Sequence, residues 1–242
     1  MTVLLRAEGL AKSFRGLKAV AGASFDVAED QISALIGPNG AGKTTVFNLI
    51  AGVYTPDAGT IHFRGQPIHG LRPDQVCAAG IGRTFQLVKP FPGLSVLDNV
   101  IVGALLVEKT VAAARAASLT ILAKLGLDAK AAQPAAMLTL TDRKRLEVAR
   151  ALAARPSILL LDEPAAGMNP TETRELMRDI VRIRDRGVAI LLIEHDMDLI
   201  RGICGRVVAL DHGTKIAEGV FEAVRDTPAV LEAYLGRRGG RA

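Results

Sequence analysis

The chain has 242 residues, of which 49% are hydrophobic and 23% are charged. A chain of this length and apolar content can bury a substantial core, which excludes a disordered protein. The formal net charge of +5 permits an anionic partner. However, the chain has only 7 Phe, 2 Tyr and no Trp, and no Lys/Arg run is interleaved with them. We therefore expect no nucleic-acid partner.

The first residues lack the basic stretch and long apolar core of a secretory signal. Apolar runs such as 188–193 are far shorter than the roughly 18 residues that a membrane helix needs. Cys77 and Cys204 lie far apart and have no metal-ligand spacing, which favours free thiols in a reducing compartment. These features predict a cytoplasmic protein that reaches a membrane only through a partner.

Strands are predicted at the beginning of the chain. Residues 4–36 contain short apolar stretches separated by turn residues at 15–16 and 29–30. The last stretch, 32–36, leads directly into glycines, and residues 44–51 are then predicted to form a helix. This order of strand, glycine-rich loop and helix frames the first candidate site.

A small antiparallel layer is predicted next, with one strand at 60–64 and another around Ile68. Residues 90–154 are rich in Ala, Leu and charged residues, which predicts helices. Breaks are expected near Gly126 and Pro134. We therefore expect a helical subdomain inserted between strands.

Strands and helices alternate after this insertion, which predicts parallel crossover units. The predicted elements are a strand at 158–161, a helix at 171–186, a strand at 188–193 and a helix at 197–203. Residues 207–210 and 215–218, joined by a turn at 211–213, predict a terminal hairpin.

The loop between the predicted strand and helix has the pattern GxxxxGK[ST]. Gly37, Gly42, Lys43 and Thr44 occupy its specified positions. Glycines let successive backbone N–H groups point at phosphate oxygens, and the helix offers the positive end of its dipole. Lys43 would reach the β and γ phosphates, while the Thr44 hydroxyl would ligate magnesium. The alternative is a glycine-rich turn without a ligand.

Acidic residues follow the buried strand predicted at 158–161. Asp162 and Glu163 would lie at its carboxyl end, where parallel sheets bind ligands. Asp162 could hold magnesium through water, and Glu163 could polarise an attacking water as a general base. His195 directly follows the next apolar strand and could approach the γ phosphate. An acidic turn and an ordinary turn histidine are the alternatives.

With these elements in order, the chain resembles the nucleotide-binding subunit of ATP-binding cassette (ABC) transporters over nearly its whole length. The matching segments, in the family's order, are 37–45, 84–86, 159–164, 166–170 and His195. The resemblance implies an α/β P-loop ABC ATPase fold, with a mostly parallel sheet core, an antiparallel β layer and an inserted helical subdomain. It implies one domain, 1–242, with the core at 1–88 and 155–242 and the subdomain at about 89–154.

The resemblance also implies bound ATP and Mg²⁺. The implied nucleotide contacts come from Phe14, which would stack on adenine, and from Gly37, Pro38, Asn39, Gly40, Ala41, Gly42, Lys43, Thr44 and Thr45. Gln86 would sense magnesium and the attacking water, alongside Thr44 and Asp162 as metal residues. Glu163, His195 and Gln86 are the implied catalytic residues. For Phe14, an ordinary core aromatic remains the alternative.

Within the family, residues 83–86, 163–170 and 233–236 are similar to the ATPases of branched-chain amino acid importers. The implied partners are a second ABC ATPase subunit, self or sister chain, in a head-to-tail dimer, and integral membrane permease subunits. A periplasmic or extracellular solute-binding protein would act indirectly. The implied location is the cytoplasmic face of the inner membrane. Phe91 and Leu94 would line a groove for a permease helix, or else belong to the core.

One segment departs from the family pattern. Residues 138–142 read Leu-Thr-Leu-Thr-Asp, where the family usually has LSGGQ or a close variant. In the family this segment contacts the γ phosphate held by the opposite subunit, so Thr139 and Thr141 are candidate nucleotide contacts. Thr139 and Asp142 can form a capping box. A carboxylate at Asp142 would repel a triphosphate unless it points away.

Two other functions remain open. A non-transport cassette ATPase could act on nucleic acid or a ribosome, but such proteins usually carry a second cassette or long coiled-coil insertions, which this chain lacks. A cassette that binds ATP as a regulatory module with weak turnover is favoured by the altered segment at 138–142. The leading hypothesis is the ATP-hydrolysing subunit of an importer for branched-chain amino acids or related small solutes.

Overall fold

A six-stranded sheet lies at the centre of the protein in the computed structural model, which describes residues 2–84 and 90–235. Its strands are, in spatial order, β10 (Thr214–Gly219), β9 (Arg206–Asp211), β3 (Ile32–Ile36), β8 (Ala189–Ile193), β7 (Ile158–Asp162) and β6 (Ile81–Arg83). Neighbouring strands are parallel except for β10, which runs antiparallel to β9. Every residue of β3, β7 and β8 is buried. A strand covered on both faces requires a nearly continuous apolar run, as these three have.

A four-stranded antiparallel sheet forms a second layer. Its strands, in spatial order, are β2 (Leu17–Ala28), β1 (Val3–Phe14), β4 (Ala58–Phe63) and β5 (Gln66–Pro67). Helix α1 (Lys43–Ile50) shares one buried apolar cluster with both sheets, and Phe47 of α1 is fully buried in it. The antiparallel layer predicted around 60–68 is therefore confirmed, with β5 ending one residue before Ile68.

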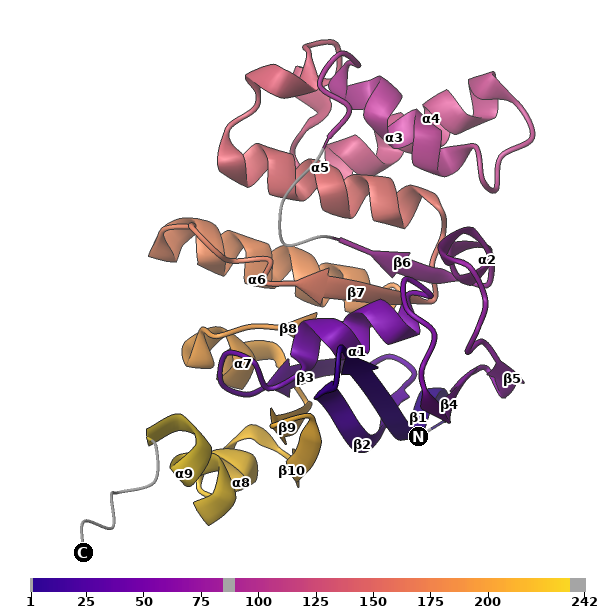
Figure 1. Ribbon diagram of the computed structural model, residues 1–242. Helices are drawn as coiled ribbons and strands as arrows, with labels where there is room; N and C mark the ends of the chain where they lie inside the picture. Colours follow the sequence, from indigo (N-terminus) through magenta and orange to yellow (C-terminus); the bar gives the residue numbers. More distant parts are fainter. Residues whose placement is uncertain (1, 85–89, 236–242) are drawn as a thin grey trace, which may run out of the picture.

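The helical insertion lies beside the edge of the central sheet that β6 forms (Figure 1). Its helices are α3 (Val96–Ala104), α4 (Val111–Lys124) and α5 (Leu140–Ala153), with short 3₁₀ helices at Asp128–Lys130 and Ala135–Met137. The side chains of Ser95, Thr110 and Thr139 cap the starts of these three α-helices by accepting backbone N–H groups. The expected breaks near Gly126 and Pro134 fall between α4 and α5.

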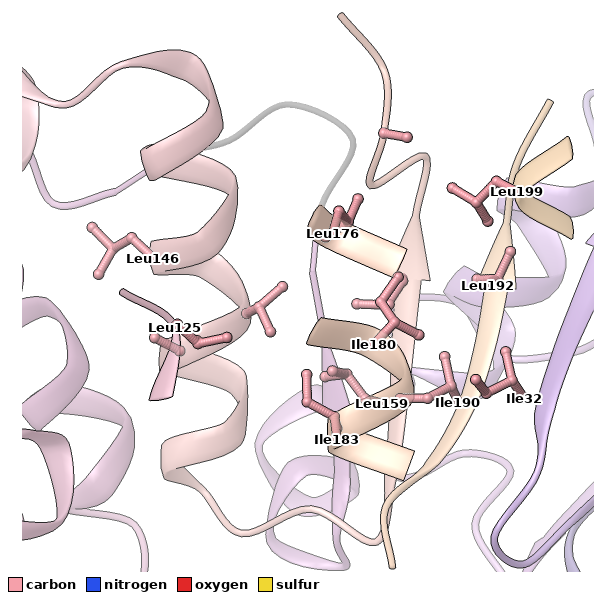
Figure 2. Close-up of a cluster of buried hydrophobic side chains, with 14 of the residues drawn as sticks. Ile32, Leu125, Leu146, Leu159, Leu176, Ile180, Ile183, Ile190, Leu192 and Leu199 are labelled. Atoms are coloured by element: carbon pink, nitrogen blue, oxygen red, sulfur yellow. The ribbon is translucent and has the colours of Figure 1, made fainter. Parts of the chain in front are cut away.

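Helix α6 (Pro170–Arg184) covers one face of the central sheet. Leu176, Ile180 and Ile183 lie on one side of α6 and point toward the side chains of β7 and β8 (Figure 2). Their spacing of four and three residues puts them on one helix face. Helix α7 (Met197–Ile203) contributes Leu199 to the same cluster.

Four short elements were missed by the sequence analysis: α2 (Pro73–Ala78), β6, α8 (Phe221–Arg225) and α9 (Pro228–Leu235). The predicted hairpin of β9 and β10 is present, but it is not terminal, because α8 and α9 follow it. These elements have three to eight residues, too few to establish a clear hydrophobic period. In the described ranges, no helix combines the length and apolar character needed to cross a bilayer.

Candidate nucleotide-binding site

The glycine-rich loop follows β3 directly and ends where α1 begins. Gly37, Gly40 and Gly42 have φ angles of 148°, 82° and 98°, which L side chains rarely adopt. A Cβ on Gly37 would lie 2.2 Å from the carbonyl oxygen of Leu210, and one on Gly42 would lie 2.4 Å from that of Ala19. The backbone conformation therefore favours glycine at all three positions, and the lack of space also requires it at Gly37 and Gly42.

Lys43 is the first residue of α1, and its side chain folds back over the loop. Its Nζ donates to the carbonyl oxygens of Gly37 at 2.7 Å and Pro38 at 2.9 Å. Burial lowers the pKa of Lys43, while the charges of Glu163 and Asp162 raise it. A cation thus lies at the start of a helix beside a turn of backbone groups, an arrangement suited to an anionic ligand.

Asp162 is the last residue of β7. It lies at the same end of the sheet as the glycine-rich loop, because β3, β8 and β7 are parallel. The residue is 3% exposed, and its Oδ1 has no hydrogen-bond partner within residues 2–84 and 90–235. Its Oδ2 lies 3.7 Å from Nη2 of Arg83. Burial raises the pKa of Asp162, and the charge of Arg83 opposes that rise. Asp162 and the exposed Thr44 line one cavity of about 710 Å³. A hydroxyl and a carboxylate oxygen are the donors that magnesium prefers, so these residues fit such an ion.

Glu163 and His195 come from neighbouring strands and meet. Oε1 of Glu163 lies 3.1 Å from Nε2 of His195. Glu163 has a φ of 48°, an uncommon conformation for a residue other than glycine. Its N–H donates to the carbonyl of Ile193, and its carbonyl accepts from Nζ of Lys144. The fold therefore brings together Glu163 and His195, two of the three residues that the sequence analysis proposed for catalysis.

Glu194 and Lys144 support this arrangement, and the sequence analysis missed both. Glu194 is 4% exposed, and its carboxylate accepts from the backbone N–H groups of Ala165 at 2.7 Å and His195 at 3.0 Å. The position of Glu194 after an apolar strand was an available signal. Lys144 also donates to the carbonyl of Pro164. No sequence signal distinguishes this buried lysine from the other cations of its helix.

Phe14 lies at the end of the β1–β2 hairpin, where it pairs with Leu17. Its ring contacts Tyr54 edge to face, with centroids 5.0 Å apart, and 38% of the residue is exposed. An ordinary core aromatic is therefore excluded. The same hairpin touches the loop through Ala19. Gln86 lies outside the described residues.

The segment 138–142 spans the start of α5. Asp142 is 6% exposed, and its Oδ2 accepts from Nζ of Lys130 and from the hydroxyl of Thr139. The N–H of Asp142 donates to Thr139, so only half of the predicted capping box forms. The hydroxyl of Thr141 donates to Glu172 at 2.7 Å. The carboxylate of Asp142 is thus paired within its own subdomain, which offsets the repulsion expected from the sequence.

This pairing predicts that Asp142→Asn destabilises the protein by about 1–2 kcal/mol at pH 7, because a hydrogen-bonded ion pair is lost. Burial raises the pKa of Asp142, but the hydrogen bonds from Lys130 and Thr139 outweigh it and hold the pKa below 3.8. The stabilisation is therefore present above pH 3.8 and is lost as the pH falls below it. Urea unfolding at pH 7 and pH 3.5 should give a smaller difference at the lower pH. An equal difference at both values would contradict this assignment.

A parallel sheet with a GxxxxGK[ST] loop at a strand end, and acids at the end of a nearby strand, defines the P-loop class of nucleotide-binding proteins. A family model described as ABC transporter matches residues 20–166. The chain belongs to the ABC transporter family.

Known proteins are similar over almost the entire chain. The high-affinity branched-chain amino acid transport ATP-binding protein LivG of Salmonella typhimurium is 43% identical, over 96% of this chain and 98% of that protein. The crystal structure of an ATP-binding cassette in its ADP conformation has a TM-score of 0.89 at 28% identity, covering 98% of this chain and 100% of that one. The fold is shared with a dimeric ATP-binding cassette in a post-hydrolysis state, bound to ADP and Pi. That structure has a TM-score of 0.82 at 22% identity, covering 90% of this chain and 99% of that one.

Proposed function

We propose that this chain binds and hydrolyses ATP to power the uptake of branched-chain amino acids or related small solutes through a partner permease. The observation that carries the proposal is the 3.1 Å contact between Glu163, which follows β7, and His195, which follows β8. Strand β8 lies between β7 and β3, the strand that leads into the loop of Lys43. This arrangement puts a carboxylate with an orienting partner near a phosphate-binding loop. The relatives named above supply the solute class.

In the proposed mechanism, the loop 37–45 binds the phosphates through backbone N–H groups of residues 39–45, at the positive end of α1. Lys43 turns from its two carbonyl partners to the β and γ phosphates. Thr44, Asp162 and Gln86 would hold magnesium, which neutralises phosphate charge when it is bound. Glu163 takes a proton from the attacking water, and His195 orients the carboxylate. Phe14, which is 38% exposed, would stack on adenine.

We propose a single domain, 1–242, with the core at 1–88 and 155–242 and the helical subdomain at about 89–154. Two such subunits would pair head to tail, and the segment 138–142 of each would face the ATP of the other. The partner is either a second copy or a sister chain. The dimeric cassette of the same fold described above supports the pairing.

The surface for the permease is proposed on the helical subdomain. Phe91 and Leu94 are 41% and 37% exposed, so they are surface residues, in keeping with the docking hypothesis. Val102 of α3 and Leu106, just after α3, are 46% and 47% exposed and line the same cavity as Thr44. Docking here would hold the chain at the cytoplasmic face of the inner membrane, with a periplasmic or extracellular solute-binding protein acting indirectly.

This docking surface predicts that Leu106→Asp abolishes co-purification with the permease while ATP binding is retained, because a charge would have to be buried at the interface. Leu119→Asp is a matched control, because Leu119 is 40% exposed on α4 and does not line the cavity. Pull-down from detergent-solubilised membranes measures both variants. Equal recovery of the permease with the two variants would contradict the assignment.

The overall function is tested by purifying the chain from membranes with its bound partners. The complex is then reconstituted into vesicles with its solute-binding protein, and uptake of labelled leucine is measured. We expect uptake only with ATP on the side of this chain. Recovery of a ribosome or nucleic acid in place of a permease would contradict the proposal.

A cassette with weak turnover is the second candidate. The hydroxyls of Thr139 and Thr141 already donate hydrogen bonds to Asp142 and Glu172 of the same subunit. In this arrangement neither hydroxyl proton is available to a phosphate of the facing ATP. A segment with committed hydroxyls would contribute less to a facing ATP. Steady-state ATPase rates of the reconstituted complex, with and without solute, separate this candidate from an active importer.

A further inference from the structure

The C-terminal helix α9 contacts the first residue of the phosphate loop. The backbone N–H of Gly37 donates to the hydroxyl oxygen of Tyr234 at 2.9 Å, across 197 positions of sequence. Helix α9 lies beyond residues 20–166, which the family model matches. The contact therefore joins the loop to a part of the chain that has no role in the mechanism proposed above.

Gly37 has little room to move. Besides the close approach to Leu210 in β9, a Cβ at Gly37 would lie 3.0 Å from Cβ of Ala41. The turn between β9 and β10 also holds the loop, because the N–H of Gly213 donates to the carbonyl of Ala41 at 3.0 Å. The C-terminal part of the chain therefore fastens the loop at two backbone groups.

The contact made by Tyr234 differs in kind from the contacts made by Lys43. Lys43 donates to the carbonyl oxygens of Gly37 and Pro38, and it must loosen those bonds when it turns to a phosphate. The hydrogen bonds from Gly37 to Tyr234 and from Gly213 to Ala41 do not involve Lys43. They can persist after Lys43 has turned, and they then hold the loop in its shape.

Tyr234 is suited to this task. Tyr234 belongs to α9, which packs against β10 and α8. Val230 of the same helix is buried, with 4% of the residue exposed. Burial raises the pKa of Tyr234 above 10, so the hydroxyl is neutral at physiological pH. A neutral hydroxyl accepts the amide hydrogen bond without adding a negative charge near a site for phosphates.

We propose that Tyr234 is a positioning residue for the phosphate loop, which it serves by fixing the backbone of Gly37 from the C-terminal helix. Its hydroxyl keeps the loop in a nucleotide-binding shape while Lys43 exchanges carbonyl partners for phosphates. The inference rests on the proposed role of the loop in binding ATP.

The test compares the full-length wild type with Tyr234→Phe, which removes only the hydroxyl. Binding of ATP with magnesium is measured by titration, and steady-state phosphate release gives KM and kcat. Loss of one backbone hydrogen bond should raise Kd and KM about three- to tenfold, with kcat changed by less than about twofold. Without nucleotide, Tm should stay within roughly 2 °C, while the increase in Tm that ATP causes should shrink.

Two further variants make the result specific. Leu235→Ala alters a residue of the same helix that is 80% exposed, and it should leave Kd, KM and kcat unchanged. Lys43→Ala tests the loop itself, and retained ATP binding in that variant would contradict the proposed function. If Lys43→Ala loses ATP and Tyr234→Phe keeps the wild-type Kd and KM, the role of Tyr234 alone is overturned. A fall in Tm without nucleotide, at unchanged Kd, would also overturn it.

Discussion

Lys43→Ala is expected to abolish ATP binding. Lys43 carries the positive charge nearest to the loop carbonyls, and no other side chain is hydrogen-bonded to the carbonyl oxygens of Gly37 and Pro38 in the described ranges. An interaction between unit charges at about 4 Å is worth up to about 4 kcal/mol at an effective dielectric constant of 20. Loss of about 3 kcal/mol of binding free energy lowers affinity by more than about 100-fold.

Titration with ATP and magnesium measures this loss. Lys124→Ala is the matched control, because Lys124 is an exposed lysine at the end of α4, away from the loop, and should bind ATP as the wild type does. The Tm of Lys43→Ala without nucleotide should show that the variant is folded. An affinity within about threefold of the wild type would contradict the phosphate-contact role, because that ratio corresponds to less than about 1 kcal/mol.

Glu163→Gln is expected to retain ATP and stop turnover. Glutamine preserves the size of the side chain and can still hydrogen-bond to His195, which lies 3.1 Å from the present carboxylate. It cannot accept a proton from water, and general-base catalysis is worth about 100- to 10,000-fold in rate. Because hydrolysis would reopen the proposed dimer, the variant should accumulate as an ATP-bound dimer.

Phosphate release measures the rate, and size-exclusion chromatography with ATP and magnesium measures the dimer. Glu29→Gln is the matched control, because Glu29 is exposed in the turn after β2 and should leave the rate unchanged. His195→Ala should lower kcat more than it changes the ATP affinity, since His195 acts through Glu163. Equal steady-state rates in Glu163→Gln and the wild type would rule out the general-base assignment.

Local features carried much of the sequence analysis. The glycine spacing of the loop requires a conformation that few residues adopt, and the short apolar run before it predicts a buried strand. Asp162 and Glu163 were recognisable because two acids after a buried strand have few structural roles. The resemblance to a known family then connected Phe14, Gln86 and His195 to the same site.

Contacts between distant segments explain what the sequence analysis missed. The effect of Asp142 depends on Lys130, which lies 12 positions earlier in a different helical turn and pairs with it only after the subdomain folds. Glu194 is a structural support rather than a free acid because backbone N–H groups from two loops converge on it. Neither set of contacts can be predicted from the spacing of these residues in the sequence.

The sequence by itself determined the class of fold, the phosphate loop at 37–45 and the acids at the end of β7, because backbone conformation and strand burial restrict which residues can stand there. Only the tertiary structure decided that Glu163 meets His195, that Asp142 turns toward Lys130, and that Tyr234 holds Gly37. These contacts join residues 12 to 197 positions apart. Their geometry arises from the packing of whole elements, which a local pattern does not encode.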